Sequence, residues 1–310
     1  MPFRIADKGE PLAVVVVDPS ASIAEAHAAA ELRRWIREAT GVVLPLQRTT
    51  ALPAKTNVIL VGPGRIARSV AKDIPWDKLG DEEAIIRAKG NRLILAGGRP
   101  RGTLYAVHRF LQNELGIRWW TPWATAIPKR TVCEIAELDR REKPAFEARN
   151  PFWYHAFDPD WAVRNGSNAQ DARLDARRGG GIDYKGFVHT FYPLVDPKKH
   201  FPRHPEWFSM DASGKRYVER GQLCTTNSGL RNYLVEQVRR WLKETPDARI
   251  VSISQNDWYG ACLCPECKVV DDGEGSSAGT MLALVNFIAE TLEKEFPKVA
   301  FDTLAYQYTR

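Results

Sequence analysis

A polar and aromatic run directly follows an apolar segment in the second half of the chain. The apolar segment, Ile250–Ser254, predicts a buried strand. The residues that follow it are Gln255, Asn256, Asp257, Trp258 and Tyr259. In a βα barrel such a loop faces the active site, so the run predicts Asp257 as an acid or base, with a carboxyl pKa that the flanking aromatics raise. The alternative is a turn that closes the strand, with Trp258 packed in the core.

Four cysteines fall in two neighbouring segments of the second half. Cys262, Cys264 and Cys267 share the loop after Asp257, and Cys224 precedes them. Four thiols match the ligand count of a structural zinc site, although the Cys-x-Cys spacing is tighter than the usual knuckle. Disulfides and buried free thiols remain open alternatives. Cys133 is predicted to be an ordinary buried thiol.

A glycine-rich segment in the first half imitates a dinucleotide-binding fingerprint. It reads Gly62-x-Gly64-x-x-Ala67, follows an apolar segment and opens a short helical pattern. Pro63 removes a backbone N–H from the phosphate loop, and the next two apolar segments read as a hairpin. The sequence therefore predicts no nucleotide, and no other catalytic cofactor is expected.

The histidines form no metal-binding pair such as HExxH. His155, His189 and His204 lie in predicted loops or strand ends, where a hydrogen-bonded structural role is the commoner one. Ten tryptophans are more than usual for a chain of 310 residues. Aromatic side chains of this kind suit both a core and a stacking site.

Composition excludes several classes of protein. The net charge is +6, but the basic residues are interspersed with acidic ones, so no nucleic-acid-binding patch is predicted. No apolar run approaches the roughly 18 residues that span a bilayer. The short apolar run near the N-terminus predicts a strand rather than a signal peptide.

Strands and helices are predicted to alternate in residues 1–140. Strands are expected at Leu12–Val17 and Val58–Val61. One helix begins at Ser20 or Ser22 and ends at Gly41, and another runs from about Thr103 to Gly116. Lys89-Gly90-Asn91 predicts the turn of a hairpin between Ala84–Ala88 and Arg92–Ala96. These elements predict an N-terminal α/β layer domain.

The charged stretch Thr131–Pro144 predicts a domain boundary at residues 140/141. After it, strands are expected at Phe146–His155, Gly186–Phe191, Leu223–Thr226, Ile250–Ser254 and Val299–Tyr306, with helices at Leu230–Leu242 and about Ser277–Phe296. This alternation predicts parallel βα units. Because the last strand has no helix to cover it, residues 141–310 are expected to form the first half of a (β/α)₈ barrel in a truncated chain.

Five segments together resemble a known family. They are RGTLYAVHRFLQNELGIRWWTP, HTFYPLVDPKKHFPRHPEWFSM, GQLCTTN, SISQNDWYGACLCPECK and LAYQYT. They resemble, in this order, a bacterial family catalogued as domain of unknown function 4838. The resemblance covers about residues 12–310 and implies a glycoside hydrolase-like protein. It implies an N-terminal domain similar to that of α-glucuronidases and β-hexosaminidases, joined to a (β/α)₈ barrel.

The resemblance also implies the roles of individual residues. Arg149 occupies the position where related glycosidases hold the sugar at the end of the first barrel strand. Asn256-Asp257 stands where hexosaminidases have Asp-Glu, so the chain departs from that pattern. Taken together with the polar and aromatic run around Asp257, this predicts contacts to a carbohydrate substrate from seven residues: Arg149, His155, His189, Gln255, Asn256, Trp258 and Tyr306.

Two functions remain open at the level of the sequence. Glycoside hydrolysis ordinarily needs two carboxylates, and the sequence identifies only Asp257. The first function is therefore a hydrolase of O-glycosidic bonds in a polysaccharide or glycan. The alternative is a carbohydrate-binding protein that keeps the scaffold without catalysis. The family suggests a periplasmic or extracellular location.

Overall fold

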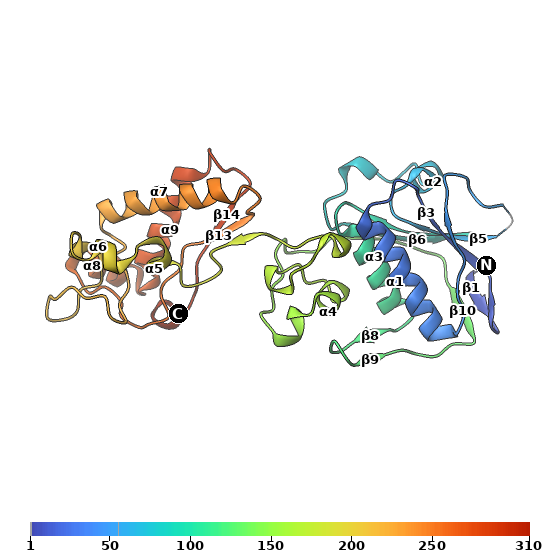
Figure 1. The fold of residues 1–310 in the computed structure, drawn as a ribbon, viewed down its shortest axis with the longest axis horizontal. Coiled ribbons are helices and arrows are strands. Elements are labelled where there is room, and N and C mark those ends of the chain that lie inside the picture. Colours follow the sequence, from blue (N-terminus) through green and yellow to red (C-terminus); the bar gives the residue numbers. More distant parts are fainter. Residues whose placement is uncertain (1, 55) are drawn as a thin grey trace. The chain divides into compact units, whose positions relative to one another are not determined.

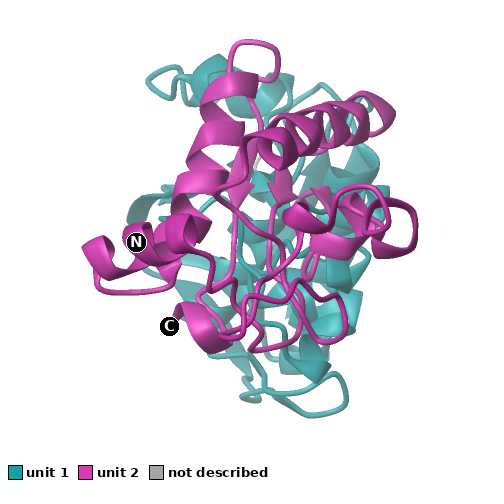
Figure 2. Ribbon diagram, turned by 90° about the vertical axis from the view of Figure 1, so that its left-hand side faces the viewer, with its two compact units in different colours: residues 1–181 teal, residues 182–310 magenta. Residues whose placement is uncertain are grey.

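The computed structural model describes residues 2–54 and 56–310, which form two compact units, Met1–Gly181 and Ile182–Arg310. Figure 2 shows them in teal and magenta, and we call them unit 1 and unit 2. Among the described residues, no helix combines the length and the apolar character that crossing a membrane requires.

A six-stranded mixed sheet forms the centre of unit 1 (Figure 1). Its order is β11-β6-β7-β5-β3-β4, and its strands are β3 (Ala13–Val17), β4 (Leu46–Arg48), β5 (Asn57–Val61), β6 (Ala84–Lys89), β7 (Arg92–Gly97) and β11 (Leu138–Glu142). β4, β3, β5 and β7 run parallel, whereas β6 is antiparallel to both β7 and β11. Each central strand is buried on both faces, which explains its continuous run of valine, isoleucine and leucine.

Two long helices cover one face of this sheet. α1 (Ile23–Thr40) begins with a capping box between Ser22 and Glu25, and Gly41, at φ 78°, ends it. α3 (Gly102–Asn113) packs beside it. The predicted strands, the hairpin and both helices of this region are therefore found within a few residues of their expected bounds.

The smaller elements of unit 1 surround this core. They are α2 (Arg65–Val70), η1 (Trp76–Lys78), the sheet of β1 (Phe3–Asp7), β2 (Glu10–Pro11) and β10 (Val132–Ile135), and the hairpin of β8 (Arg118–Trp119) and β9 (Thr125–Ala126). The expected boundary at residues 140/141 falls inside unit 1, because β10 pairs with β1 and β11 pairs with β6. The charges there lie on the exposed sides of edge strands, and the contacts divide the chain after Gly181 instead.

Residues 146–181 contain short helices instead of the strand predicted at Phe146–His155. After a coil come η2 (Tyr154–Phe157), α4 (Pro159–Arg164), η3 (Gln170–Ala172) and η4 (Ala176–Arg178). Two local features prevent the predicted strand. Pro151 has no N–H to donate to a neighbouring strand, and Phe152 has a left-handed backbone at φ 44°.

Unit 2 is built on three parallel strands in the order β12-β13-β14. They are β12 (Tyr184–Lys185), β13 (Ile250–Ser252) and β14 (Ala300–Asp302). The helices are α5 (Phe191–Leu194), α6 (Pro197–His200), η5 (Pro205–Trp207), α7 (Ser228–Glu244), α8 (Pro265–Glu274), α9 (Ala278–Leu292) and η6 (Gln307–Thr309). The apolar faces of α7 and α9 share one core with Val251 and Ile253 of the β13 segment.

Two further strands predicted for this region do not form as expected. At Gly186–Phe191 the strand ends at Lys185, because Gly186 is left-handed at φ 64° and Phe191 opens α5. A side chain at Gly186 would lie 2.7 Å from the Trp241 ring, so the glycine permits a close approach. At Leu223–Thr226 the structure has a single bridge between Leu223 and Phe208.

Candidate functional site

The loop after β13 is held by two buried amides. Gln255 is fully buried, and its Nε2 donates to the carbonyls of Leu304 and Tyr306 and to Thr309 Oγ1. Asn256 is 5% exposed and donates from Nδ2 to the Gly221 carbonyl. These two predicted ligand-binding amides therefore join the loop to its neighbours.

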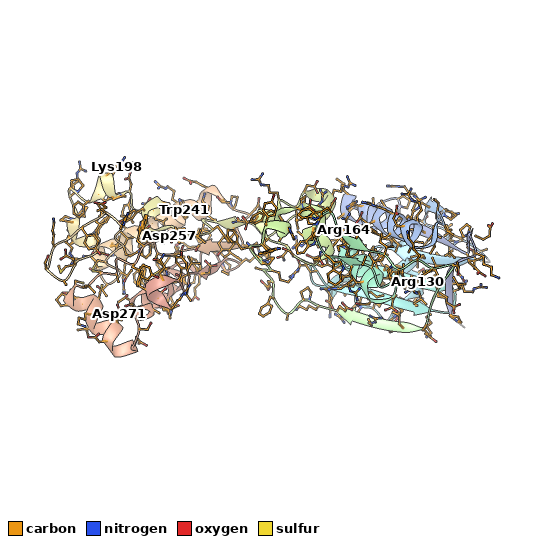
Figure 3. The ribbon with its side chains drawn as sticks, turned by 90° about the horizontal axis from the view of Figure 1, so that it is seen from below. Arg130, Arg164, Lys198, Trp241, Asp257 and Asp271 are labelled. Atoms are coloured by element: carbon orange, nitrogen blue, oxygen red, sulfur yellow. The ribbon has the colours of Figure 1, made fainter. Side chains whose placement is uncertain are left out.

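Asp257 lies exposed at the carboxyl end of this strand, and Figure 3 labels it within unit 2. Its Oδ1 accepts hydrogen bonds from the Tyr306 hydroxyl at 2.8 Å and from Gln307 Nε2 at 2.9 Å. His189 donates from Nδ1 to the Gln255 carbonyl at 2.8 Å, and its ring lies 5.6 Å from that of Tyr306. The structure thus brings together three of the sequence-predicted residues, Asp257, His189 and Tyr306, with Gln307 added.

The aromatic residues after Asp257 face solvent. Trp258 is 42% exposed and Tyr259 is 74% exposed, which argues against a purely packing role for Trp258. The Arg220 guanidinium lies 5.7 Å from the Trp258 ring centroid. Because Asp257 is itself exposed, the expected loss of solvation at its carboxylate is not found.

Three residues of this site have an unusual backbone. His189, Arg220 and Gln307 have φ of 57°, 50° and 53°, in the left-handed region that non-glycine residues seldom adopt. Such strain costs about 1–3 kcal/mol per residue, and it clusters at functional sites where the surrounding structure enforces it. Lys8, Phe152 and Arg173, outside this site, share the left-handed backbone, so the conformation does not by itself mark a functional role.

Gln222 is a site residue that the sequence did not single out. It is fully buried, donates from Nε2 to the carbonyls of Asn256 and Trp258, and accepts from the Asn256 N–H. Its three hydrogen bonds hold the backbone on both sides of Asp257. The sequence offered one signal for the role of Gln222, namely a polar residue directly before the apolar Leu223.

Asp302 is a second carboxyl that sequence reasoning missed. It ends β14, pairs in register with Ser252 of β13, and accepts a hydrogen bond from the Tyr184 hydroxyl. Burial raises the pKa of its carboxyl to about 7. The signal in the sequence was an acid inside the apolar stretch from Val299 to Leu304.

Arg149 and His155 belong to unit 1, and each is engaged there. The Arg149 guanidinium forms an ion pair with Glu82 at 2.7 Å and donates to the Tyr105 hydroxyl and to the Gly166 carbonyl. His155 lies among aromatic rings, with Trp123 at 4.8 Å and Trp153 at 5.8 Å. These contacts fix both side chains within unit 1, and their binding of a carbohydrate stays a prediction.

The glycine-rich segment Gly62–Ala67 also has a structural explanation. Asp18 accepts the N–H of Arg65 at the start of α2, and a side chain at Gly64 would lie 2.6 Å from Asp18. This carboxylate stands where a bound phosphate would need to lie, and like charges repel. The following hairpin of β6 and β7 agrees with the sequence prediction.

The four cysteines of unit 2 form one cluster. Cys224, Cys262, Cys264 and Cys267 are buried, and their Sγ atoms all lie within 4.8 Å of one another. Such a set could hold one metal ion as thiolates. Cys133 is buried separately in unit 1, as predicted.

The mixed α/β fold resembles that of glycosidases with barrel domains. The structure is similar to that of a family GH115 4-O-methyl-α-glucuronidase with specificity for decorated arabinogalactans, with a TM-score of 0.52 and 13% identity. The match covers 96% of this chain and 42% of that one. The chain belongs to the family described as domain of unknown function (DUF4838), whose model matches residues 119–310.

A second solved structure is more distantly similar. It is a mutant β-hexosaminidase of Streptomyces plicatus in complex with its product GlcNAc, at a TM-score of 0.47 and 11% identity. The match covers 97% of this chain and 62% of that one, so the chain spans less than two thirds of either glycosidase. No curated protein matches the chain.

Proposed function

We propose that this protein is a glycoside hydrolase that cleaves O-glycosidic bonds in a polysaccharide or glycan. The observation that carries the proposal is that Asp257, near the carboxyl ends of the parallel strands, accepts hydrogen bonds from Tyr306 and Gln307. The exposed Trp258 is its neighbour in the chain. In the proposal, β12, β13 and β14 belong to a (β/α)₈ barrel, whose active site lies at that end of the strands. The likeness to an α-glucuronidase supports the scaffold.

The proposed mechanism uses the side chains in distinct roles. Asp302 is the proposed general acid: with a pKa of about 7 its protonated form is populated at neutral pH, and it gives this proton to the leaving glycosidic oxygen as the bond to the sugar breaks. Asp257 is the proposed general base, which takes a proton from the water that attacks the sugar, while Tyr306 and Gln307 orient its carboxylate. The Trp258 face stacks on a sugar ring, and the adjacent Arg220 favours an acidic sugar.

Asp257→Asn tests the proposal because it keeps the side-chain shape and removes the titrating group. Turnover of aryl glycosides, with glucuronides included because of the similar α-glucuronidase, is expected to fall about 10²–10⁴-fold. Binding of the product sugar, measured by calorimetry, is expected to persist. Asp272→Asn, at an exposed position on α8, is the matched control. Unchanged turnover in Asp257→Asn would reject the role.

A second candidate function is carbohydrate binding without catalysis. The observation that favours it is that Oδ1 of Asp257 already accepts two hydrogen bonds, which suits a residue that fixes neighbouring loops. Under this function the unaltered protein binds oligosaccharides and turns over none of the glycosides. Measuring binding and turnover on the same panel of sugars separates the two functions.

A further inference from the structure

The cysteine cluster of unit 2 has the dimensions of a tetrahedral metal centre. Cys224 Sγ lies 3.6 Å from Cys264 Sγ and 3.8 Å from Cys267 Sγ. Four thiolates about 2.3 Å from a central zinc ion stand about 3.8 Å apart along each tetrahedral edge. Every Sγ is within 4.8 Å of the other three, so the four thiols form one set rather than two separate pairs.

The surroundings of the cluster favour thiolates. Cys264 caps α8, and Cys267 lies in its first turn, where the positive end of the helix stabilises negative charge. Cys262 Sγ accepts hydrogen bonds at 3.4 Å from the Met210 N–H and from the Arg216 guanidinium. Because a zinc ion with four thiolates carries a net charge of about −2, this guanidinium offsets part of it.

The donor set also indicates the kind of metal site. Four thiolates fill the coordination shell of zinc and leave no position open for water or substrate, which defines a structural rather than a catalytic site. The cysteines are 7% exposed or less, so solvent has little access to them. Thiolate ligands in a tetrahedron select zinc or iron over the harder divalent cations.

We propose that Cys224, Cys262, Cys264 and Cys267 bind one zinc ion that fastens the loop of Asp257 to the segment that contains Cys224. Cys262 stands five residues after Asp257, and Cys224 stands two after Gln222, whose side chain holds the same loop. The ion joins the two segments at a second point. This inference concerns folding and stands independently of the proposed hydrolysis.

The first test is metal analysis of the 310-residue chain after extensive dialysis. About one zinc per chain is expected, as is a cobalt-substituted protein with the thiolate charge-transfer and ligand-field absorption of a tetrahedral sulfur site. Chelation of zinc from the unaltered protein is expected to release four reactive thiols and to speed hydrogen exchange in residues 257–263. These measurements need no variant and no activity assay.

The second test uses matched cysteine variants. Cys224→Ser and Cys267→Ser are expected to lose stoichiometric zinc, whereas Cys133→Ser, at a buried thiol of unit 1, keeps it. Absence of zinc together with a loss of titratable thiols under denaturing, non-reducing conditions would overturn the proposal in favour of disulfides. Iron in place of zinc, or a full complement of unreactive thiols without metal, would overturn it as well.

Discussion

Asp302 is the buried carboxyl of unit 2 whose ionisation the fold disfavours. Burial raises its pKa to about 7, from 3.8 in an ordinary aspartate. The folded protein therefore holds this proton at pH values where the unfolded chain has released it. Stability is consequently lost as the pH rises from about 4 to about 7, and the loss is complete above that range.

Asp302→Asn is expected to remove this pH-dependent loss. The amide keeps an oxygen that can accept from the Tyr184 hydroxyl, and it carries no charge at any of these pH values. The difference in Tm between the variant and the unaltered protein is expected to grow by a few degrees, in favour of the variant, as the pH rises from 5 to 8. Thermal unfolding across this range measures it. A Tm difference that stays constant with pH, or one shared by the control Asp272→Asn, would contradict the assignment.

The loop after β13 is an element whose conformation depends partly on a side chain that is distant in sequence. Gln222 satisfies the N–H of Asn256 and the carbonyls of Asn256 and Trp258. Replacing it by leucine leaves these groups without their partner, at a cost of about 1–3 kcal/mol for each that stays buried. Gln222→Leu is therefore expected to lower the free energy of unfolding by about 2–5 kcal/mol.

Denaturant unfolding measures the stability change, and limited chymotrypsin digestion at Trp258 and Tyr259 measures the loop itself. Cleavage there is expected to accelerate more than cleavage elsewhere in unit 2. Gln237→Leu on α7, whose side chain is half-buried, is the matched control. A loss of stability without faster cleavage in the loop would show that Gln222 supports the core and not this element.

The elements that the sequence predicted well are those that local signals define. Ser22 and Gly41 mark the ends of α1, and the valine run of β3 marks a strand buried on both faces. The segment from Phe146 to Gly181 has only short signals of this kind, such as Asp158 and Pro159 at the start of α4. Contacts to remote residues fix it, as when Asn168 donates to Glu82 at 2.8 Å across 86 positions of sequence.

The site shows the same contrast between local signals, which the sequence contains, and contacts between remote residues, which it does not show. Asp257 was found because a strand pattern and a polar run adjoin in sequence. The importance of Asp302 depends on its burial and on Tyr184, which lies 118 positions away. Likewise, the spacing of the cysteines indicated four ligands, but only the fold shows that the loop of Cys224 meets the other three.

At the scale of the whole molecule, the two units have separate apolar cores and separate polar anchors. In unit 1 the buried Glu31 of α1 accepts hydrogen bonds from Arg164 of α4 at 2.7 and 3.1 Å, and Figure 3 labels Arg164. Trp35 also donates to Glu31. Burial acts to raise the pKa of the Glu31 carboxyl, but the nearby His108 and Arg164 outweigh it and hold that pKa well below its usual range.

Folding lowers this pKa from its ordinary value of 4.5. The interaction therefore stabilises unit 1 above about pH 4.5, and its contribution to stability fades as the pH falls below that value. Arg164→Met removes the partner and leaves a buried carboxylate. It is expected to destabilise unit 1 by about 3–5 kcal/mol at pH 7 and by less at pH 3. Adding Glu31→Gln to this variant is expected to restore much of the loss.

Hydrogen exchange measured by mass spectrometry shows which of the two units the Arg164→Met substitution destabilises. Peptides of α1, α3 and α4 are expected to exchange faster in Arg164→Met, while those of α7 and α9 keep their protection, because the core of α7 and α9 contains no residue of unit 1. Cys267→Ser is expected to give the opposite pattern. If either variant accelerates exchange equally in both sets of helices, the two units unfold together and the independence argued from their cores is wrong.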